Sequence, residues 1–527
     1  MTNLETPTRT VVRFYNRRGT AEQWIENCKQ ALKLPPVVVE RGVTGAERDR
    51  IPPGKVVGRQ FLCPKRAKCM KVFSKLILAG AAGFVLLQLV RPNIPFGPAT
   101  AEVQVPAQVK QVLEKGCYSC HSDEPHLAWF DQIVPGYWLV RYDVRTGREH
   151  LNFSTLGSKP AAIQKATLYE GVNMMQLGAM PPPRFVALHP EAKVTPVDLA
   201  TLKAYLAPWT PAPEQAGTEA KTEASPATVS GEKIQPVSLA SVQPEFDGFP
   251  FDSEFGGWKP IGFTDRGDNN TFRFILGNDI AVKAIQSGTI SPWPDGTRFA
   301  KVAWQQQLGP DGLIHSGKFV QVELMDKAAK RYKSTDGWRW GRWRGSNLKP
   351  YGADARFVTE CMSCHMPVRG NDYVYTLPIT AAHVSREEIV NNTAADLPAS
   401  LPYQPLEWTA ITTYVNPGDH TMTTLYGNET AIRSLNLRGA DAMTAPSYAA
   451  GAVLALVTWT QRDDPHWFGA RIPSAPQSIE FVQVQAEGGR NSYRRFAGAE
   501  LAPSHAETAT EAARAKLILG LAPVSLP

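Results

Sequence analysis

The two stretches Glu360-Cys361-Met362-Ser363-Cys364-His365 and Gly116-Cys117-Tyr118-Ser119-Cys120-His121 organise this chain. Each holds two cysteines two residues apart, followed directly by a histidine. Cysteines at this spacing reach both vinyl groups of one haem, and the adjacent histidine then reaches the iron. A zinc half-site or a redox dithiol, the other common uses of C-x-x-C, needs no histidine there. The sequence therefore predicts two covalently bound c-type haems, with His121 and His365 as iron ligands and Cys117, Cys120, Cys361 and Cys364 as attachment points.

The remaining cysteines indicate the compartment. The chain has seven cysteines, and the three outside the two boxes are Cys28, Cys63 and Cys69. After Met70 no thiol is left over for a disulfide or a zinc cluster. Haem attachment to such boxes occurs outside the bacterial inner membrane, so we expect an export signal.

Residues 70–101 have the pattern of such a signal. Lys71 and Lys75 form a basic start, residues 76–90 are apolar except for Gln88, and Ala99-Thr100-Ala101 fits a small-x-small cleavage site. A retained membrane anchor ending near Arg91 is the alternative. We expect a periplasmic protein, either soluble or anchored to the inner membrane by this N-terminal segment.

The first 69 residues do not fit this plan. The chain has 56 Lys and Arg against 49 Asp and Glu, and residues 1–75 alone hold 16 against 6. The overall charge of +7 is therefore no nucleic-acid footprint, and no nucleic-acid partner is expected. Residues 10–33, which contain VVRFYNRRGTAEQWIENCKQALK, resemble a segment of insertion-sequence transposases. The resemblance implies that residues 1–69 are a non-native extension, and a genuine cytoplasmic extension is the alternative.

Residues 102–209 are predicted to form an all-α, cytochrome c-like haem domain. Val105, Val109, Val112 and Leu113 recur at helical spacing before the first box. Thr195-Pro196-Val197-Asp198 has the signature of a helix start near the end of the domain. Through CYSCHSDEP, WLVRYDVRTGREHLNFS and GAMPPPRF this region also resembles a bacterial haem-binding domain family.

Met180 is the candidate sixth ligand of the first haem iron. It lies in the rigid loop Gly178-Ala179-Met180-Pro181-Pro182-Pro183, and thioether ligation raises a haem's reduction potential. Met174 and Met175 are expected to fill core gaps on a helix. The competing ligands are His126, His150 and His189.

Residues 210–243 are rich in Pro, Ala, Glu, Thr and Ser and predict a flexible linker.

The rest of the chain contains an internal repeat. Trp258 matches Trp408, Gly277-Asn278-Asp279 matches Gly427-Asn428-Glu429, Trp304 matches Trp459, and the FVQV of residues 319–322 matches that of residues 481–484. Several matched segments alternate apolar with other residues. We therefore predict two α+β domains with mainly antiparallel sheets, residues 244–380 with a haem and residues 381–527 without.

The second copy lacks both the box and a lysine. Its residues 513–521 contain no cysteine or histidine, and Leu456 stands where the first copy has Lys301, three residues before the matched tryptophan. A lysine lost together with a haem indicates a haem partner. A solvent-facing strand lysine is the alternative.

The first copy resembles the cytochrome P-460 family through WPDGTRFAKVAW, GWRWGRWR and ECMSCHMPV, over about residues 243–380. The resemblance implies a mainly antiparallel sheet with helices. Some members oxidise hydroxylamine at a haem that a lysine cross-links to the porphyrin, and others bind nitric oxide. It implies that His365 is the proximal ligand and Lys301 the cross-linking candidate.

The surrounding residues suggest a site with an open iron face. Met366 directly follows His365 and cannot reach the opposite face, so a small molecule could bind there. Glu323 or Asp326 is a candidate proton acceptor, although acids on an alternating strand are usually solvent-facing. We expect Trp338, Trp340 and Trp343 to pack around the haem, with Arg339, Arg342 and Arg344 available to its propionates.

Together these features predict an exported dihaem c-type cytochrome, an oxidoreductase that couples electron transfer to the binding or oxidation of a small nitrogen compound such as hydroxylamine. Its partners would be that small molecule and a redox protein. The alternatives are a nitric oxide-binding or purely electron-carrying cytochrome, and a structural protein with spectator haems.

Overall fold

The computed structural model describes residues 66–124, 126–206, 238–355, 357–379, 391–435, 446–486, 489–505, 508–524 and 526. The transposase-like segment and residues 210–237 of the predicted linker lie outside these ranges. The described residues form two compact units, residues 66–94 with 127–142, and residues 95–126 with the chain from 143 onward.

The first unit contains helix α3 (Arg66–Leu87) and the start of helix α6 (Gly136–His150). The Gln88 side chain donates to the Val134 carbonyl oxygen and accepts from the Val134 N–H, both at 2.9 Å. The Tyr137 hydroxyl donates to the Pro92 carbonyl oxygen at 2.7 Å. The residues that follow α3 are thus bonded to the residues around the start of α6. Among the described helices, none is both long and apolar enough to cross a membrane.

The second unit begins with short helices, which confirm the predicted helical haem-binding region. They are α4 (Ala107–Gly116), α5 (Tyr118–His121), the end of α6, α7 (Phe153–Leu156), α8 (Ala161–Gln176), α9 (Pro183–Val186) and α10 (Pro196–Leu206). Val109, Val112 and Leu113 are buried, as their spacing predicts. At the start of α10, the Thr195 hydroxyl accepts from the Asp198 N–H and the Asp198 carboxylate accepts from the Thr195 N–H, so the predicted helix cap is present.

The residues just before α4 belong to this helical region. Gly97 donates its N–H to the Asp123 carbonyl oxygen at 2.9 Å, and Ala101 donates to that of Ser154 at 2.9 Å. In return, the Gly157 N–H donates to the Ala101 carbonyl oxygen at 2.9 Å. The ordered domain therefore starts earlier than the predicted residue 102.

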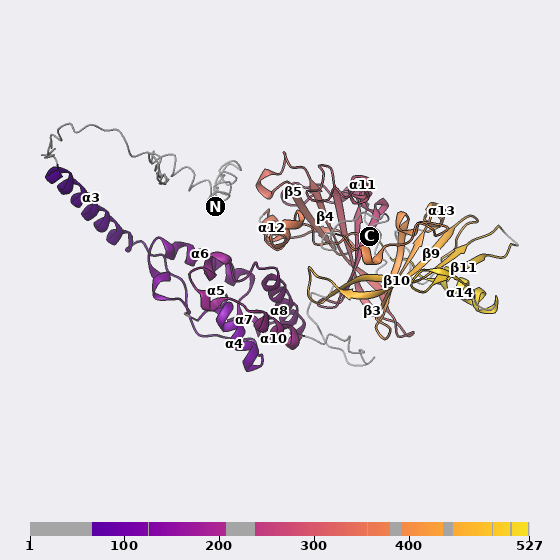
Figure 1. The fold of residues 1–527 in the computed structure, drawn as a ribbon, viewed down its shortest axis with the longest axis horizontal. Helices are drawn as coiled ribbons and strands as arrows, with labels where there is room; N and C mark the ends of the chain where they lie inside the picture. Colours follow the sequence, from indigo (N-terminus) through magenta and orange to yellow (C-terminus); the bar gives the residue numbers. More distant parts are fainter. Residues whose placement is uncertain are drawn as a thin grey trace, which may run out of the picture. The chain divides into compact units, whose positions relative to one another are not determined.

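The two repeated copies are built into one sheet rather than two. The first copy supplies β1 (Lys259–Arg266), β2 (Thr271–Gly277), β3 (Arg298–Leu308), β4 (Ile314–Lys327), β5 (Trp338–Arg344) and β6 (Lys349–Pro350). The second supplies β7 (Thr409–Asn416), β8 (Thr421–Gly427), β9 (Val453–Asp463), β10 (Ala470–Gln483), β11 (Ser492–Ala497) and β12 (Ala502–Ser504). All twelve strands pair antiparallel in a single sheet (Figure 1).

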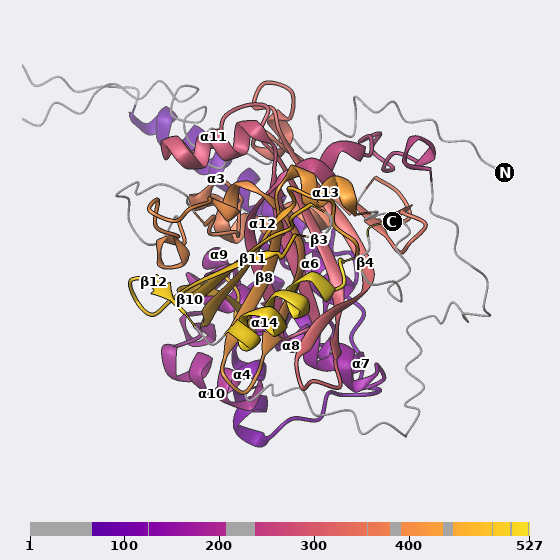
Figure 2. The same cartoon turned by 90° about the vertical axis from the view of Figure 1, so that its right-hand side faces the viewer.

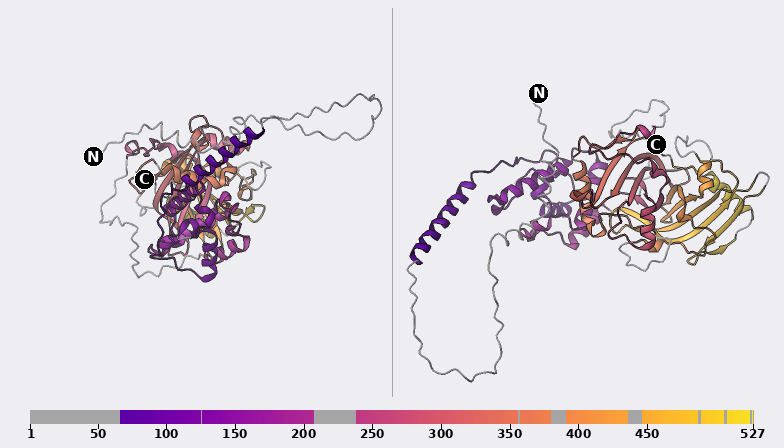
Figure 3. Two further views of the ribbon diagram at one scale, coloured as in Figure 1. Left: turned by 90° about the vertical axis from the view of Figure 1, so that its left-hand side faces the viewer. Right: turned by 90° about the horizontal axis from the view of Figure 1, so that it is seen from above.

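Each copy pairs with the other through equivalent strands. Strand β1 of the first copy pairs with β10 of the second, through Asp265 opposite Arg471. Strand β7, the counterpart of β1, pairs with β4, the counterpart of β10, through Val415 opposite Ile314. Figure 3 shows the strands of one copy continuing into those of the other. A shared apolar core lies between them and buries the matched tryptophans Trp304 and Trp459.

The repeat prediction is confirmed at the helix starts and wrong at one strand. Asn278 caps α11 (Asp279–Ser287) and Asn428 caps α13 (Glu429–Ser434), each accepting from an alanine N–H three residues on. In β4, however, Val322 lies opposite Val302, and in β10 Ile479 holds the equivalent place opposite Val457. The FVQV segments are therefore not equivalent. Both hairpins have their register shifts at the same places, beside Trp304 and Trp459, but the turn after β9 is two residues longer than the turn after β3, since Asp463 pairs with Arg471 whereas Leu308 pairs with Ile314.

The end of the predicted linker is part of the β region. Leu239 and Val242 pack against the shared core, and the Trp343 indole N–H donates to the Gln243 carbonyl oxygen at 2.9 Å. The linker prediction is therefore wrong for residues 238–243, whose apolar side chains have a core to pack on.

We expect Gly157→Ala to destabilise the helical region. A Cβ at Gly157 would lie 2.5 Å from the Glu102 carbonyl oxygen, and such overpacking costs about 1–3 kcal/mol. At the mid-helix Gly171 a Cβ would meet nothing within 4 Å, so Gly171→Ala should instead stabilise α8 by about 0.5–1 kcal/mol. Thermal unfolding followed by circular dichroism measures both. Equal melting temperatures for the two variants would contradict the close packing of residues 101–102.

Candidate functional site

The first box joins two helices. Cys117 lies between α4 and α5, and α5 carries Cys120 and His121. His121 Nδ1 lies 2.9 Å from the Leu151 carbonyl oxygen, which fixes the orientation of the ring. Burial lowers the pKa of His121 and favours the neutral imidazole. A neutral ring held through one nitrogen is what an iron ligand requires.

Met180 lies in a tight loop close to this box. Its N–H donates to the Met174 carbonyl oxygen at 3.1 Å, and its side chain is 40% exposed. The next residue, Pro181, lies 3.8 Å from where a Cβ on Gly116 would be. Met175 packs against the domain core, as predicted. Iron ligation by Met180 stays a prediction.

The competing histidines have other contacts. The His189 ring stacks on Phe185 with centroids 4.0 Å apart, and His126 Nε2 lies 3.6 Å from a Glu124 carboxylate oxygen. His150 is exposed.

The second box lies on helix α12 (Phe357–His365), beside β5 (Figure 1). His365 Nδ1 lies 2.7 Å from the Tyr373 carbonyl oxygen, so this ring is fixed in the same way as His121. Burial lowers the pKa of His365 to about 4. Its ring centroid is 5.7 Å from that of Trp340 and 5.3 Å from that of Tyr375.

The cysteines of both boxes lie apart from other possible metal ligands. Burial raises the pKa of Cys117 and of Cys361 to about 12. No group of three or more potential metal-ligating side chains forms within the part of the chain that the structure describes.

A row of charged side chains crosses the sheet beside the second box. Lys301 on β3 lies opposite Glu323 on β4, which lies opposite Arg342 on β5. Lys301 forms an ion pair with Glu323, and Arg342 Nε lies 3.2 Å from a Glu323 carboxylate oxygen. These two cations hold the pKa of Glu323 well below its usual range. Burial lowers the pKa of Lys301 to about 8.

This face of the sheet has unmet donors that suit an anionic ligand. Arg273 on β2 is close enough to lower the pKa of Glu323 further, so three cations share one half-buried carboxylate. The buried Arg273 Nε and Trp340 Nε1 have no hydrogen-bond partner among the described residues. Trp340 and Cys361 belong to one apolar cluster. An apolar cluster next to unpaired donors, one of them a guanidinium, fits a haem with its two propionates.

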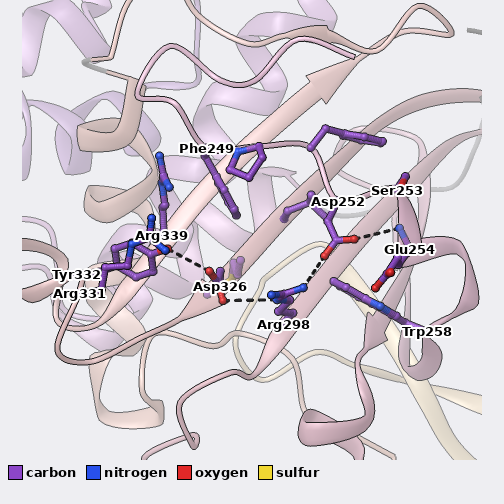
Figure 4. Close-up of a pocket in the computed structure, with 14 residues that line it drawn as sticks. Phe249, Asp252, Ser253, Glu254, Trp258, Arg298, Asp326, Arg331, Tyr332 and Arg339 are labelled. Atoms are coloured by element: carbon purple, nitrogen blue, oxygen red, sulfur yellow. Dashed lines mark hydrogen bonds and ion pairs between the residues drawn. The ribbon is translucent and has the colours of Figure 1, made fainter. Parts of the chain in front are cut away.

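Asp326 and Trp343 do not belong to this face. Successive strand residues point to opposite sides, so Asp326 lies on the side away from Glu323, and Trp343 on the side away from Trp340. Asp326 lines a separate cavity of about 410 Å³, where it lies 3.8 Å from Arg298 and accepts from the Tyr332 hydroxyl (Figure 4). Trp343 is buried in the core shared by the two copies. The structure therefore brings Lys301 and Glu323 to the second box, but not Asp326.

The three arginines that were predicted to be available to the propionates lie on different faces of β5. Arg342 and Arg344 lie on the side of Trp340, whereas Arg339 lies on the other side and binds Asp247 at 3.1 Å.

The second copy fills the equivalent space with protein. Leu456 lies between Leu425 and Glu480, in the place that Lys301 holds between Ile275 and Glu323, so the predicted replacement is confirmed. Helix α14 (Thr508–Gly520) lies across this part of the sheet (Figure 2). It contributes Ala515 and Ile518 to an apolar cluster that also contains Leu425 and Leu456. Its Arg514 donates two hydrogen bonds to Glu480.

Several functional residues were not predicted from sequence. The carbonyl oxygens of Leu151 and Tyr373 orient the histidines, and a carbonyl leaves no trace in residue type. Arg273 could have been found from the repeat. Its equivalent in the second copy is Thr423, so a second cation of the first copy is replaced there.

The fold and the two boxes define a multidomain, haem-binding cytochrome. Residues 78–208 match the family model of the haem-binding domain, and residues 253–376 match that of cytochrome P460, in the predicted order. The cytochrome c peroxidase Ccp of Escherichia coli (strain K12) is 28% identical over 154 residues, which are 26% of this chain and 33% of that protein. The chain thus spans about a third of that relative's length.

We expect Arg514→Ala to destabilise the second copy. Glu480, 4% exposed, would lose both hydrogen bonds from Arg514, which costs roughly 2–4 kcal/mol for a buried carboxylate whose partner is partly exposed. The control is Arg433→Ala, whose exposed pair with Glu429 contributes at most about 0.5 kcal/mol. Urea unfolding measures both free energies. An effect of Arg514→Ala as small as the control's would show that Glu480 does not need the cation.

We expect Gly147→Ala to lower the haem-to-protein ratio. A Cβ at Gly147 would lie 2.8 Å from the Cys120 carbonyl oxygen and would displace the first box from α6. At Gly136, in the same helix, a Cβ would meet nothing within 4 Å, so Gly136→Ala is the matched control. The pyridine haemochrome spectrum of purified protein gives the ratio. Full haem content in Gly147→Ala would argue against this close approach.

Proposed function

We propose that this protein is an exported dihaem c-type cytochrome that couples electron transfer to the binding or oxidation of a small nitrogen compound, such as hydroxylamine, at its cytochrome P460 domain. Both haems would be held by thioethers, one at Cys117 and Cys120 and the other at Cys361 and Cys364. The export pattern of residues 70–101 and the demands of haem attachment support a periplasmic location, with or without retention of the N-terminal segment at the inner membrane.

One observation carries this proposal: the half-buried row of Lys301, Glu323 and Arg342 lies on the same side of the sheet as Trp340, whose ring lies next to that of His365. The copy without a box has a leucine in place of the lysine. A charged row is costly to bury, so its presence only beside the box supports a role in the chemistry there.

The residues divide the work as follows. His365 would ligate iron through Nε2, and bound haem would supply an iron that takes up and passes on single electrons. Arg273 and Arg342 would hold the propionates. Glu323 would accept protons from a nitrogenous substrate, which must lose protons as it is oxidised.

Cross-linking of Lys301 would raise the pKa of Glu323 and so make it a better proton acceptor. While Lys301 and Arg342 both bear charge, Glu323 is a weak base because they hold its pKa low. Burial lowers the pKa of Lys301 to about 8, so the neutral, nucleophilic amine is more accessible than in an ordinary lysine. A bond between this nitrogen and a porphyrin carbon would replace one N–H and one C–H bond, and two protons and two electrons would pass to an oxidant such as peroxide. The amine would then lose its charge, so the pKa of Glu323 would rise and the carboxylate would become a better proton acceptor.

A second candidate is a nitric oxide-binding or purely electron-carrying cytochrome. The ion pair between Lys301 and Glu323 favours it, since a paired ammonium is not nucleophilic. In either case the first haem would exchange electrons with a redox partner protein. The similarity to a cytochrome c peroxidase supports haem redox chemistry and no particular substrate.

We expect the peptide around Cys361 and Cys364 to carry haem and also to be joined through it to the peptide containing Lys301. Mass spectrometry of a tryptic digest checks this, and Lys301→Arg is the control because arginine keeps the charge but cannot form the bond. The wild type should then oxidise hydroxylamine and the variant should not. Haem at the box with a free Lys301 peptide would instead favour the ligand-binding candidate, and no haem on the peptide would refute both.

A further inference from the structure

The loop of residues 464–469, between β9 and β10 of the haem-less copy, contacts two other regions of the chain. Its sequence is Asp-Pro-His-Trp-Phe-Gly. The equivalent loop of the first copy, residues 309–313 between β3 and β4, is Gly-Pro-Asp-Gly-Leu and has no aromatic residue. The aromatic residues are thus a feature of the copy that lost its haem.

One side of this β9–β10 loop binds helix α8 of the haem-binding domain. The Phe468 ring stacks on Tyr169, with centroids 5.2 Å apart and planes inclined by 25°. The fully buried Asn173 accepts from the Phe468 N–H and donates to the Phe468 carbonyl oxygen at 3.2 Å. An amide that satisfies both backbone groups of one residue fixes that residue's position as a strand pairing would.

The neighbouring contacts make the fit close. Gln176 donates to the Pro465 carbonyl oxygen at 3.0 Å, and Lys203 Nζ lies 5.2 Å from the Phe468 ring centroid. Gly469 has φ of +85°, and a Cβ there would lie 2.7 Å from the Tyr169 ring. Phe468 packs against the apolar core of the haem-binding domain itself.

The other side of the loop reaches the second box through Tyr375. The Trp467 ring meets Tyr375 edge-on at 5.5 Å, and His466 Nδ1 donates to the Tyr375 carbonyl oxygen at 2.6 Å. The Tyr375 hydroxyl in turn donates to the Cys364 carbonyl oxygen at 2.6 Å, and its ring lies 5.3 Å from that of His365. Trp467 is itself fixed by Arg266, whose guanidinium lies 4.2 Å from its ring centroid.

We propose that the β9–β10 loop of the haem-less copy is a docking element for the chain's own haem-binding domain, and that it holds the two haem sites together so that an electron passes between them within one molecule. One electron leaves the site at His365 and arrives at the site at His121, and no covalent bond or proton changes place. Only the direction of electron transfer, from the site at His365 to the site at His121, rests on the proposed function. The docking itself does not depend on any substrate.

Cleavage of the chain between the haem-binding domain and the β region measures whether the two parts remain associated. A protease site is placed between residues 210 and 237 of the haem-loaded protein, which is cleaved and run on a size-exclusion column. The two fragments of the wild type should co-elute. Phe468→Ala should weaken their association by roughly 30-fold, the effect expected for a buried aromatic anchor, and Asn173→Ala should weaken it from the other side of the contact. Asp311→Ala, in the equivalent loop of the first copy, should leave co-elution unchanged.

A second readout follows the electron in the uncut protein. After rapid partial reduction, the visible spectra of the two haems should equilibrate at a rate independent of protein concentration in the wild type and in Asp311→Ala. In Phe468→Ala the rate should fall at least tenfold, with the spectra of both oxidised haems unchanged as a check on folding. Separation of the wild-type fragments, or co-elution and an unaltered rate in Phe468→Ala, would overturn the proposal, whether or not hydroxylamine is oxidised.

Discussion

A buried carboxylate in the sheet needs a cation, and the two copies meet this need differently. In the first copy Glu323 is paired with Lys301 and Arg342 from the neighbouring strands, and the space above this row is left for α12 and its box. In the second, Glu480 takes its cation from Arg514 on α14, and leucine replaces the lysine. The equivalent acid thus lies beside further cations and unpaired donors in one copy and under a packed helix in the other. Desolvation explains why neither acid could remain without its partner.

The strand pairing makes the haem-less copy indispensable to the other. Strands β1 and β4 of the first copy each end on a strand of the second, and the tryptophans Trp304 and Trp459 lie in one core. Removal of the second copy would expose that core and leave two strand edges unpaired. The copy without a box therefore supports the geometry of the copy with one, including the row of charges on its opposite face.

The sequence contained most of what defines the haem sites and little of what positions them. The boxes, the helix cap at Thr195 and the loss of Lys301 could all be predicted, because each depends on residue type at fixed spacing. Asp326 could not be distinguished from Glu323, since one residue of register decides the face of a strand. The FVQV match misled because the turn after β9 is two residues longer than the turn after β3, so the pairing places Ser478 and Ile479, and not residues 483 and 484, at the positions of Gln321 and Val322. Trp343 was predicted to pack around the haem because it lies near Trp338 and Trp340 in the sequence. Strand alternation places it on the opposite face, in the core shared by the two copies.

The β9–β10 loop belongs to the copy without a cysteine box. A hairpin of that copy has no box beside it to leave accessible. Its base is fixed by the pairing of Ala470 and Arg471 with β1, so its tip is held beside Tyr375 by the same contacts that join the copies. Aromatic residues at such a tip can be buried at small entropic cost, because the strands beneath are already ordered. The position of Phe468 against Tyr169 thus follows from the exchanged strand pairing and not from the loop alone.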